Sequence, residues 1–183
     1  MNAAEIRFTL LYNAHYRAIL GYLLRRLDSV ATAQDLTEDV FLIAWRKLDE
    51  VPEGDEGGYW LYGVARPVLA NHLRTSARRV GLLGFRTPRP PPAQPDEQVV
   101  RSEEARTVMA AVTRLRKQDR ELIRLAYWDE LPHAVIGDLL GCSRNAVDVR
   151  LHRALRRLKK AMTRSGHFQV EELGMRAPEE TPS

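Results

Sequence analysis

Arginine and lysine side chains recur along one stretch of the sequence at spacings that place them on one side of a helix. Residues Ser143–Arg164 hold eight Lys or Arg and one acid, Asp148, which gives +7, whereas the whole 183-residue chain carries only +4. Cations concentrated on one element are suited to neutralising nucleic-acid phosphates. The alternative interpretation is an ordinary solvated face of a surface helix.

The elements that position these cations form a predicted helix-turn-helix over Leu131–Arg164. Gly141 can adopt the left-handed conformation that ends the first helix, and Ser143 is a favourable N-cap for the second. The second helix has an apolar face at helical spacing, made of Val147, Leu151, Ala154, Leu155, Leu158 and Met162. The pattern favours a basic second helix that enters a DNA major groove.

Other chemistry is not indicated. The sequence shows no Gly-rich phosphate loop and no metal-ligand spacing among its five histidines, so we expect no enzyme, no metal and no cofactor. The lone Cys142 is interpreted as a small apolar plug in the turn rather than a nucleophile. The first residues lack a signal-peptide pattern, and no apolar run approaches a membrane span, so a cytoplasmic location is expected, with no membrane partner.

The N-terminal part contains two predicted helices, over Phe8–Leu27 and about Ala33–Asp49. The second helix carries one exposed leucine, Leu42, on a stripe that is otherwise charged. The stripe consists of Asp35, Glu38, Asp39, Leu42 and Arg46. A protein contact and a stray surface leucine are equally good interpretations of Leu42.

A third helix is expected over Tyr59–Arg79, after a loop at Val51–Gly58. It contains four arginines and no acid, and begins with aromatic residues. Rings beside arginines suit single-stranded nucleic acid, but the sequence alone favours the alternative, in which the aromatic residues belong to the core and the arginines to a solvated helix end. Pro67 removes a backbone donor, so we expect a kink or a short non-helical join near Gly63–Pro67.

The fold class predicted is all-α, with two small helical domains. A Pro-rich linker over 80–100 separates domain 1–79 from domain 101–164, and an acidic tail occupies 165–183. Within the second domain, a support helix capped by Asp119 is expected to precede the helix-turn-helix.

The order of these motifs resembles the extracytoplasmic-function (group IV) sigma factors of bacterial RNA polymerase. The region 2-like match is AQDLTEDVFLIAWRKLDEVP followed by WLYGVARPVLANHLRTSARR. The region 4-like match is LRKQDRELIRLAYWDELPHAVIGDLLGCSRNAVDVRLHRALRRLKKAM. The family often has Glu and Ala where Val135 and Gly137 stand, and Asn and Asp where Pro67 and Asn71 stand. A promoter sequence therefore cannot be transferred from other members.

The resemblance implies that the chain binds core RNA polymerase and directs it to −10 and −35 promoter elements. The charged stripe would dock on the β′ clamp, the C-terminal domain would meet the β flap, and an anti-sigma factor is an expected partner. Candidate −10 contacts are Trp60, Arg66, Asn71 and Arg74, near the loop that would capture an unstacked base. Candidate −35 contacts are Arg144, Asn145 and Asp148 for base edges, and Arg150, Arg153 and Arg157 for phosphates. The competing hypothesis is a helix-turn-helix transcriptional regulator with an N-terminal sensing or dimerising domain.

Overall fold

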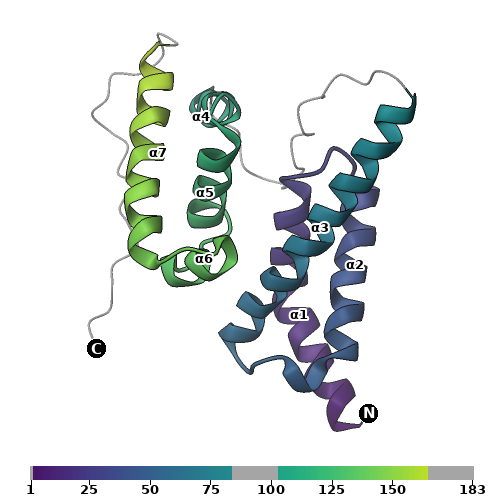
Figure 1. Ribbon diagram of the computed structural model, residues 1–183. Helices are drawn as coiled ribbons and strands as arrows, with labels where there is room; N and C mark the ends of the chain where they lie inside the picture. Colours follow the sequence, from purple (N-terminus) through teal and green to yellow (C-terminus); the bar gives the residue numbers. More distant parts are fainter. Residues whose placement is uncertain (1, 84–102, 165–183) are drawn as a thin grey trace.

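The computed structural model describes residues 2–83 and 103–164, and within these ranges every regular element is helical, which confirms the all-α prediction. The N-terminal half contains α1 (Ala3–Leu24), α2 (Val30–Arg46), a 3-10 turn (Leu48–Glu50) and α3 (Asp55–Leu83). The C-terminal half contains α4 (Glu103–Thr113), α5 (Lys117–Tyr127), α6 (His133–Leu140) and α7 (Arg144–Arg164). The two halves lie side by side (Figure 1). Most of the expected linker and the acidic tail fall outside the described residues.

The helices of the N-terminal half begin where side chains satisfy the free backbone donors. Asn2 and Glu5 form a reciprocal capping box on α1, and Ser29 accepts from the Thr32 amide at 3.2 Å on α2. The three helices then pack around side chains with no exposed surface, including Ile19, Val40 and Leu61. The buried side chains recur at helical spacing, whereas Trp45 of α2 and Leu73 of α3, which the same spacing places on the apolar faces, are exposed.

Helix α3 differs from the prediction at two places. It begins at Asp55, not near Tyr59. The expected loop is helical at Gly58, where the absence of a side chain lets α3 pack closely against His15 of α1: a Cβ on Gly58 would lie 2.7 Å from the His15 ring. It also runs through Pro67 without a non-helical join, so that part of the expectation is wrong, while a kink there stays a prediction. Gly63, whose carbonyl loses its donor, is exposed, so water can satisfy that carbonyl.

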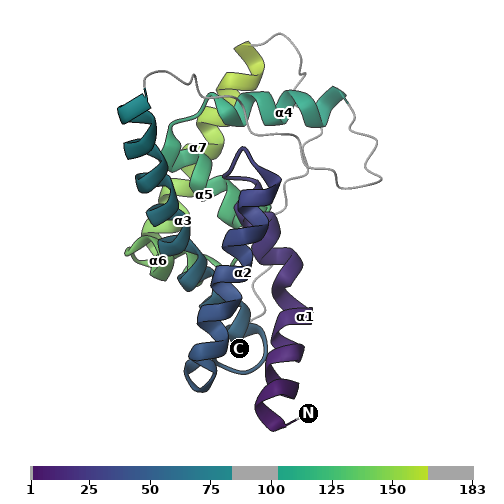
Figure 2. The same cartoon turned by 90° about the vertical axis from the view of Figure 1, so that its right-hand side faces the viewer.

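In the C-terminal half, α6 and α7 form the predicted helix-turn-helix. Gly141 ends α6 with a φ of 67°, and Ser143 accepts a hydrogen bond from the Ala146 amide at 3.2 Å. The apolar face of α7 is buried against α4, α5 and α6, and α4 crosses one end of this group (Figure 2). Asp119 does not cap the support helix, which begins at Lys117; its carboxylate instead accepts from Arg157 at 2.9 Å.

Candidate nucleic-acid and partner-binding surfaces

The exposed face of α7 lies opposite its buried apolar face. Asn145, Arg150 and Arg153 are exposed on the helix, and Arg144 lies at its first turn. At about 100° per residue, Asn145 and Arg153 lie about 160° and 120° from the buried Val147, measured in opposite directions around the helix. These two side chains therefore point away from the domain, into the space that a DNA groove would occupy.

Two of the candidate DNA contacts are already engaged within the domain. Asp148 forms an ion pair with His133 Nδ1, from the first turn of α6. Arg157 is bound to both carboxylate oxygens of Asp119 at 2.9 Å, which ties α7 to α5. Asp148 is therefore oriented by its neighbour, and Arg157 supports the packing of the helix in addition to any phosphate contact.

The candidate residues on α3 do not share one face. At about 100° per residue, Trp60, Asn71 and Arg74 lie within about 60° of one another, whereas Arg66 lies about 120° from Trp60. Trp60 is half-buried against the core, while Asn71 and Arg74 are exposed. The Arg66 guanidinium donates to the backbone carbonyl of Leu139, at the end of α6. The structure thus turns Arg66 toward the C-terminal half.

The aromatic residues at the start of α3 serve mainly as core. Tyr62 is 5% exposed and packs edge-on against Tyr22, with ring centroids 5.3 Å apart. Burial raises the pKa of Tyr22 to about 12 and that of Tyr62 further. These rings are unavailable for base stacking, which favours the core interpretation for Tyr62.

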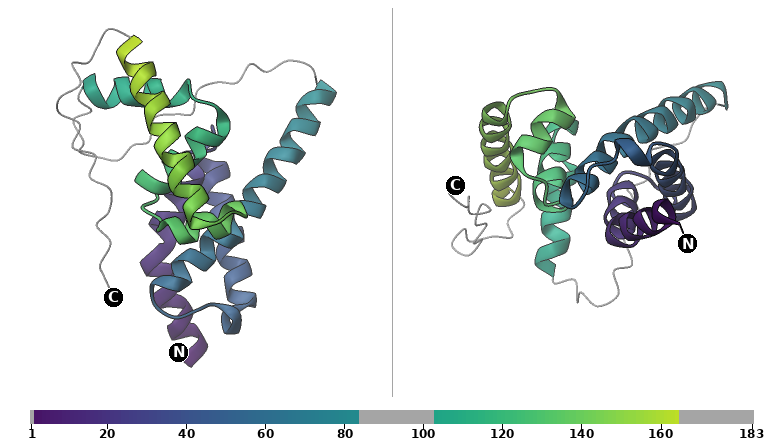
Figure 3. Two further views of the ribbon diagram at one scale, coloured as in Figure 1. Left: turned by 60° about the vertical axis from the view of Figure 1, so that its left-hand side comes forward. Right: turned by 90° about the horizontal axis from the view of Figure 1, so that it is seen from below.

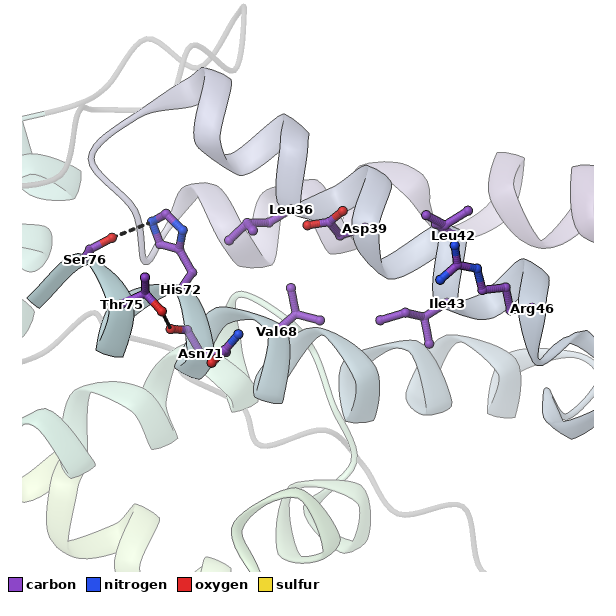
Figure 4. Close-up of a pocket in the computed structure, with 10 residues that line it drawn as sticks. All are labelled: Leu36, Asp39, Leu42, Ile43, Arg46, Val68, Asn71, His72, Thr75 and Ser76. Atoms are coloured by element: carbon purple, nitrogen blue, oxygen red, sulfur yellow. Dashed lines mark hydrogen bonds between the residues drawn. The ribbon is translucent and has the colours of Figure 1, made fainter. Parts of the chain in front are cut away.

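The five residues of the α2 stripe are all exposed, and Leu42 is 46% exposed. Beside the stripe, a groove of about 460 Å³ runs between α2 and α3 (Figure 4). Asp39, Leu42 and Arg46 form one wall, and Asn71 and Thr75 lie on the other. The stripe and the α3 face that carries Asn71 therefore border the same groove.

A buried ionic cluster joins the two halves, and sequence analysis missed it. Arg25 and Arg26, after the end of α1, both bind Asp129, which follows α5; the Arg26–Asp129 distance is 3.0 Å. Arg26 also binds Glu121 at 3.0 Å, and its guanidinium lies 3.7 Å from the Tyr22 ring centroid. Burial alone would lower the pKa of Arg26, but the carboxylates of Glu121 and Asp129 outweigh burial and raise it.

This cluster and the Arg66 contact hold α6 beside α3 (Figure 3). In the sequence, Arg25 and Arg26 are a basic pair near the end of the first helix. No local pattern indicated their partners, which lie about one hundred residues away in the chain.

Neither a metal centre nor a membrane span is found in the described parts of the chain. Within residues 2–83 and 103–164, no group of three or more His, Cys, Asp or Glu side chains is arranged to hold a metal ion. No helix in these ranges is long and apolar enough to cross a bilayer.

Comparison with known proteins matches both halves. Residues 11–79 match the family Sigma-70 region 2, and residues 105–158 match Sigma-70, region 4. RNA polymerase sigma factor YlaC of Bacillus subtilis is 30% identical over 163 residues, which cover 85% of this chain and 91% of that protein. ECF RNA polymerase sigma factor SigL of Mycobacterium tuberculosis is 28% identical over 158 residues, with coverage of 85% and 89%.

The fold has also been seen in solved structures. The sigma factor RpoE, in complex with the anti-sigma factor NepR from Bartonella quintana, superposes with a TM-score of 0.65 at 21% identity. The aligned part covers 85% of this chain and 96% of that one. At this level of identity the likeness concerns the fold alone.

Proposed function

The chain belongs to the extracytoplasmic-function group of the sigma-70 family of RNA polymerase sigma factors, and on that premise we propose how its surfaces divide the work of promoter recognition. The α2 stripe docks on the β′ clamp of core polymerase. The exposed face of α3 contacts the −10 strand. Helix α7 contacts the −35 duplex, while its domain rests on the β flap. Members of this family are transcription initiation factors, not enzymes.

The observation that carries the proposal is the presence, in one chain, of two exposed surfaces of opposite character. The α2 stripe presents three carboxylates around the exposed Leu42, which suits a protein partner with cationic and apolar groups. Helix α7 presents arginines, which suit phosphates. A helix-turn-helix regulator with a sensing domain would explain only the second surface, and the region 2 match of residues 11–79 disfavours it.

The −10 contacts on α3 are proposed for the exposed residues Asn71 and Arg74, with Trp60 at the start of the helix and Arg66 after release from Leu139. The loop before α3 is short, since the helix begins at Asp55, and Gly54 has a φ of 64°. A strand that enters from this loop would meet Trp60 first and Arg74 about 21 Å further along the helix.

The arrangement of the two halves must change for both DNA elements to be bound. The −10 and −35 elements lie about 25 base pairs apart, which is about 85 Å of B-DNA at 3.4 Å per base pair. In the structure, Arg66 of α3, the helix that carries the −10 candidates, touches α6, which adjoins the −35 helix. We therefore infer that the ionic cluster opens when the chain binds core polymerase and promoter.

An anti-sigma factor is the expected antagonist. The support is the family membership and the fold likeness to a sigma factor that was solved with one. An antagonist that binds the halves in their closed arrangement would keep the −10 and −35 surfaces together and prevent promoter binding.

The direct test is run-off transcription with purified core polymerase on a library of promoter fragments, paired with a core-binding titration of Asp39→Ala/Leu42→Ala. We expect promoter-specific transcripts from the wild-type chain and at least tenfold weaker core binding by the double variant, because a central apolar contact and a charge are lost. Leu10→Ala is the matched control, since Leu10 is an exposed leucine (66%) on α1, away from the stripe.

Helical content of the double variant should equal that of the wild type, because both side chains are exposed. Unchanged core affinity in this variant would contradict the docking assignment. Absence of any core-dependent transcript, together with regulator-like binding to duplex DNA by the chain alone, would contradict the proposed function as a whole.

A further inference from the structure

Val149 is an apolar side chain at the centre of the exposed face of α7. It is 43% exposed, and at about 100° per residue it lies about 160° from the buried Val147. Asn145 precedes it by one helical turn and Arg153 follows it by one turn, and both are exposed. Val149 is therefore out of phase with the apolar face and does not belong to the core.

Helix stability does not explain this valine. Valine is a poorer helix former than the polar residues usual on an exposed face, because its branched side chain loses rotamer freedom in a helix. Leaving it 43% exposed also keeps apolar surface in water. A partner that covers Val149 must supply one small apolar group.

The charges around Val149 restrict the class of partner. Arg150, Arg153 and Arg156 are exposed on the same helix. An apolar protein surface would have to desolvate these guanidinium groups, whereas a nucleic acid pairs them with phosphates. The partner that satisfies both the arginines and the valine is duplex DNA.

The major groove offers one small apolar group on its base edges, the 5-methyl group of thymine. Val149 lies in the second turn of the recognition helix, within the part that reaches base edges in helix-turn-helix complexes. We propose that Val149 contacts the 5-methyl group of a thymine in the −35 duplex, and so determines part of the promoter sequence. This inference rests on the proposed function of α7.

The neighbours of Val149 predict which bases lie next to the contacted thymine. Asn145 is one turn nearer the N-terminus, where its amide can bind N6 and N7 of an adenine. The rise over four residues is about 6 Å, so the thymine should lie about two base pairs from that adenine. Asp148, held by His133, can accept from a cytosine amino group between them.

The experiment uses the full chain with core polymerase and a duplex library randomised over the −35 element. In each selected duplex, every thymine is replaced singly by deoxyuridine, which removes the 5-methyl group and keeps every hydrogen-bonding atom. At one position we expect the wild-type chain to bind the deoxyuridine duplex about fourfold more weakly than the thymine duplex, because one buried methyl group contributes about that much to affinity. Val149→Ser should bind the two duplexes equally.

Val149→Thr is the matched control, because threonine keeps a branched methyl group in nearly the same shape. It should retain a preference for thymine over deoxyuridine at the same position. Circular dichroism checks that Val149→Ser keeps its helices; if it does not, the comparison of the wild type with Val149→Thr and Val149→Ala carries the test.

The outcomes separate this inference from the function on which it rests. Selected duplexes without thymine, or with thymines that are insensitive to loss of the methyl group, would overturn the contact while leaving the −35 assignment of α7 intact. Equal sensitivity in the wild type, Val149→Ser and Val149→Ala would assign the methyl contact to another residue. Failure to select any −35 sequence would instead overturn the proposed function.

Discussion

Replacing Asp129 by asparagine should open the interface between the two halves. The Asp129 side chain has no exposed surface, and its two carboxylate oxygens bind the guanidinium groups of Arg25 and Arg26. Asparagine has nearly the same shape but carries no charge and keeps one acceptor oxygen. The substitution therefore leaves two partly dehydrated cations facing each other without their shared anion.

The magnitude follows from the contacts that are lost. A hydrogen bond to a charged group is worth about 1.5–3 kcal/mol, and removal of one member of a buried ion pair costs about 3–5 kcal/mol. The amide oxygen of asparagine recovers part of this, and opening lets water reach both arginines. We estimate a shift of about 2–3 kcal/mol toward the open state, which is about 30- to 150-fold in the opening equilibrium.

Small-angle X-ray scattering of the free full-length chain measures the opening as an increase in radius of gyration. Glu121→Gln should give a smaller increase, because Glu121 is 28% exposed and binds only Arg26 of the pair. Glu50→Gln is the matched control: it breaks the Lys47–Glu50 pair (2.9 Å), which is exposed and lies within the N-terminal half.

Opening should also release Arg66, so Asp129→Asn should strengthen binding of −10 single strands by the free chain. Circular dichroism should show unchanged helical content, because the cluster joins the two halves and lies outside their apolar cores. An unchanged radius of gyration with normal helicity would refute the reasoning, since it would mean that apolar contacts alone hold the halves together.

Two further predictions concern α7 and His15. Arg153→Ala should weaken promoter binding about equally for all sequences and reduce the slope of log affinity against log salt concentration by about one. Asn145→Ala should instead cost about 1–3 kcal/mol of binding free energy at one base pair only. Equal losses across all sequences for both variants would contradict the assignment of Arg153 to a phosphate and Asn145 to a base. Burial lowers the pKa of His15 below its ordinary 6.5, and Asp55 only partly offsets this. The unfolded chain therefore binds the proton more tightly, so the free energy of unfolding should fall as the pH drops below 6.5, and His15→Gln should reduce that fall in urea titrations.

The sequence by itself determined the features that depend on neighbouring residues. The buried face of α7, the left-handed Gly141 and the Ser143 cap all follow from spacings of four residues or fewer, and all are present in the structure. The exposed α2 stripe follows from the same periodicity, because a helix repeats every 3.6 residues whatever it packs against. The charge of α7 requires only a count of residues.

Predictions failed where a residue's role depended on a partner from another element. Asp119 was expected to cap its own helix but binds Arg157 of α7. The glycines before α3 indicated a loop, but Gly58 lies inside the helix because the His15 ring packs against it. In each case the local sequence allowed both roles, and packing selected one.

The tertiary structure alone decided how the two halves meet. Helical periodicity predicts which face of a helix is buried but not which element covers that face. A pair of arginines after a helix can be solvated or can bind a distant carboxylate, and the local sequence does not distinguish the two. Arg26 and Asp129 are 103 residues apart, so they can pair only after both halves have folded and brought the two groups together. That long-range pairing makes Arg25 and Arg26 part of the ionic contact between the two halves.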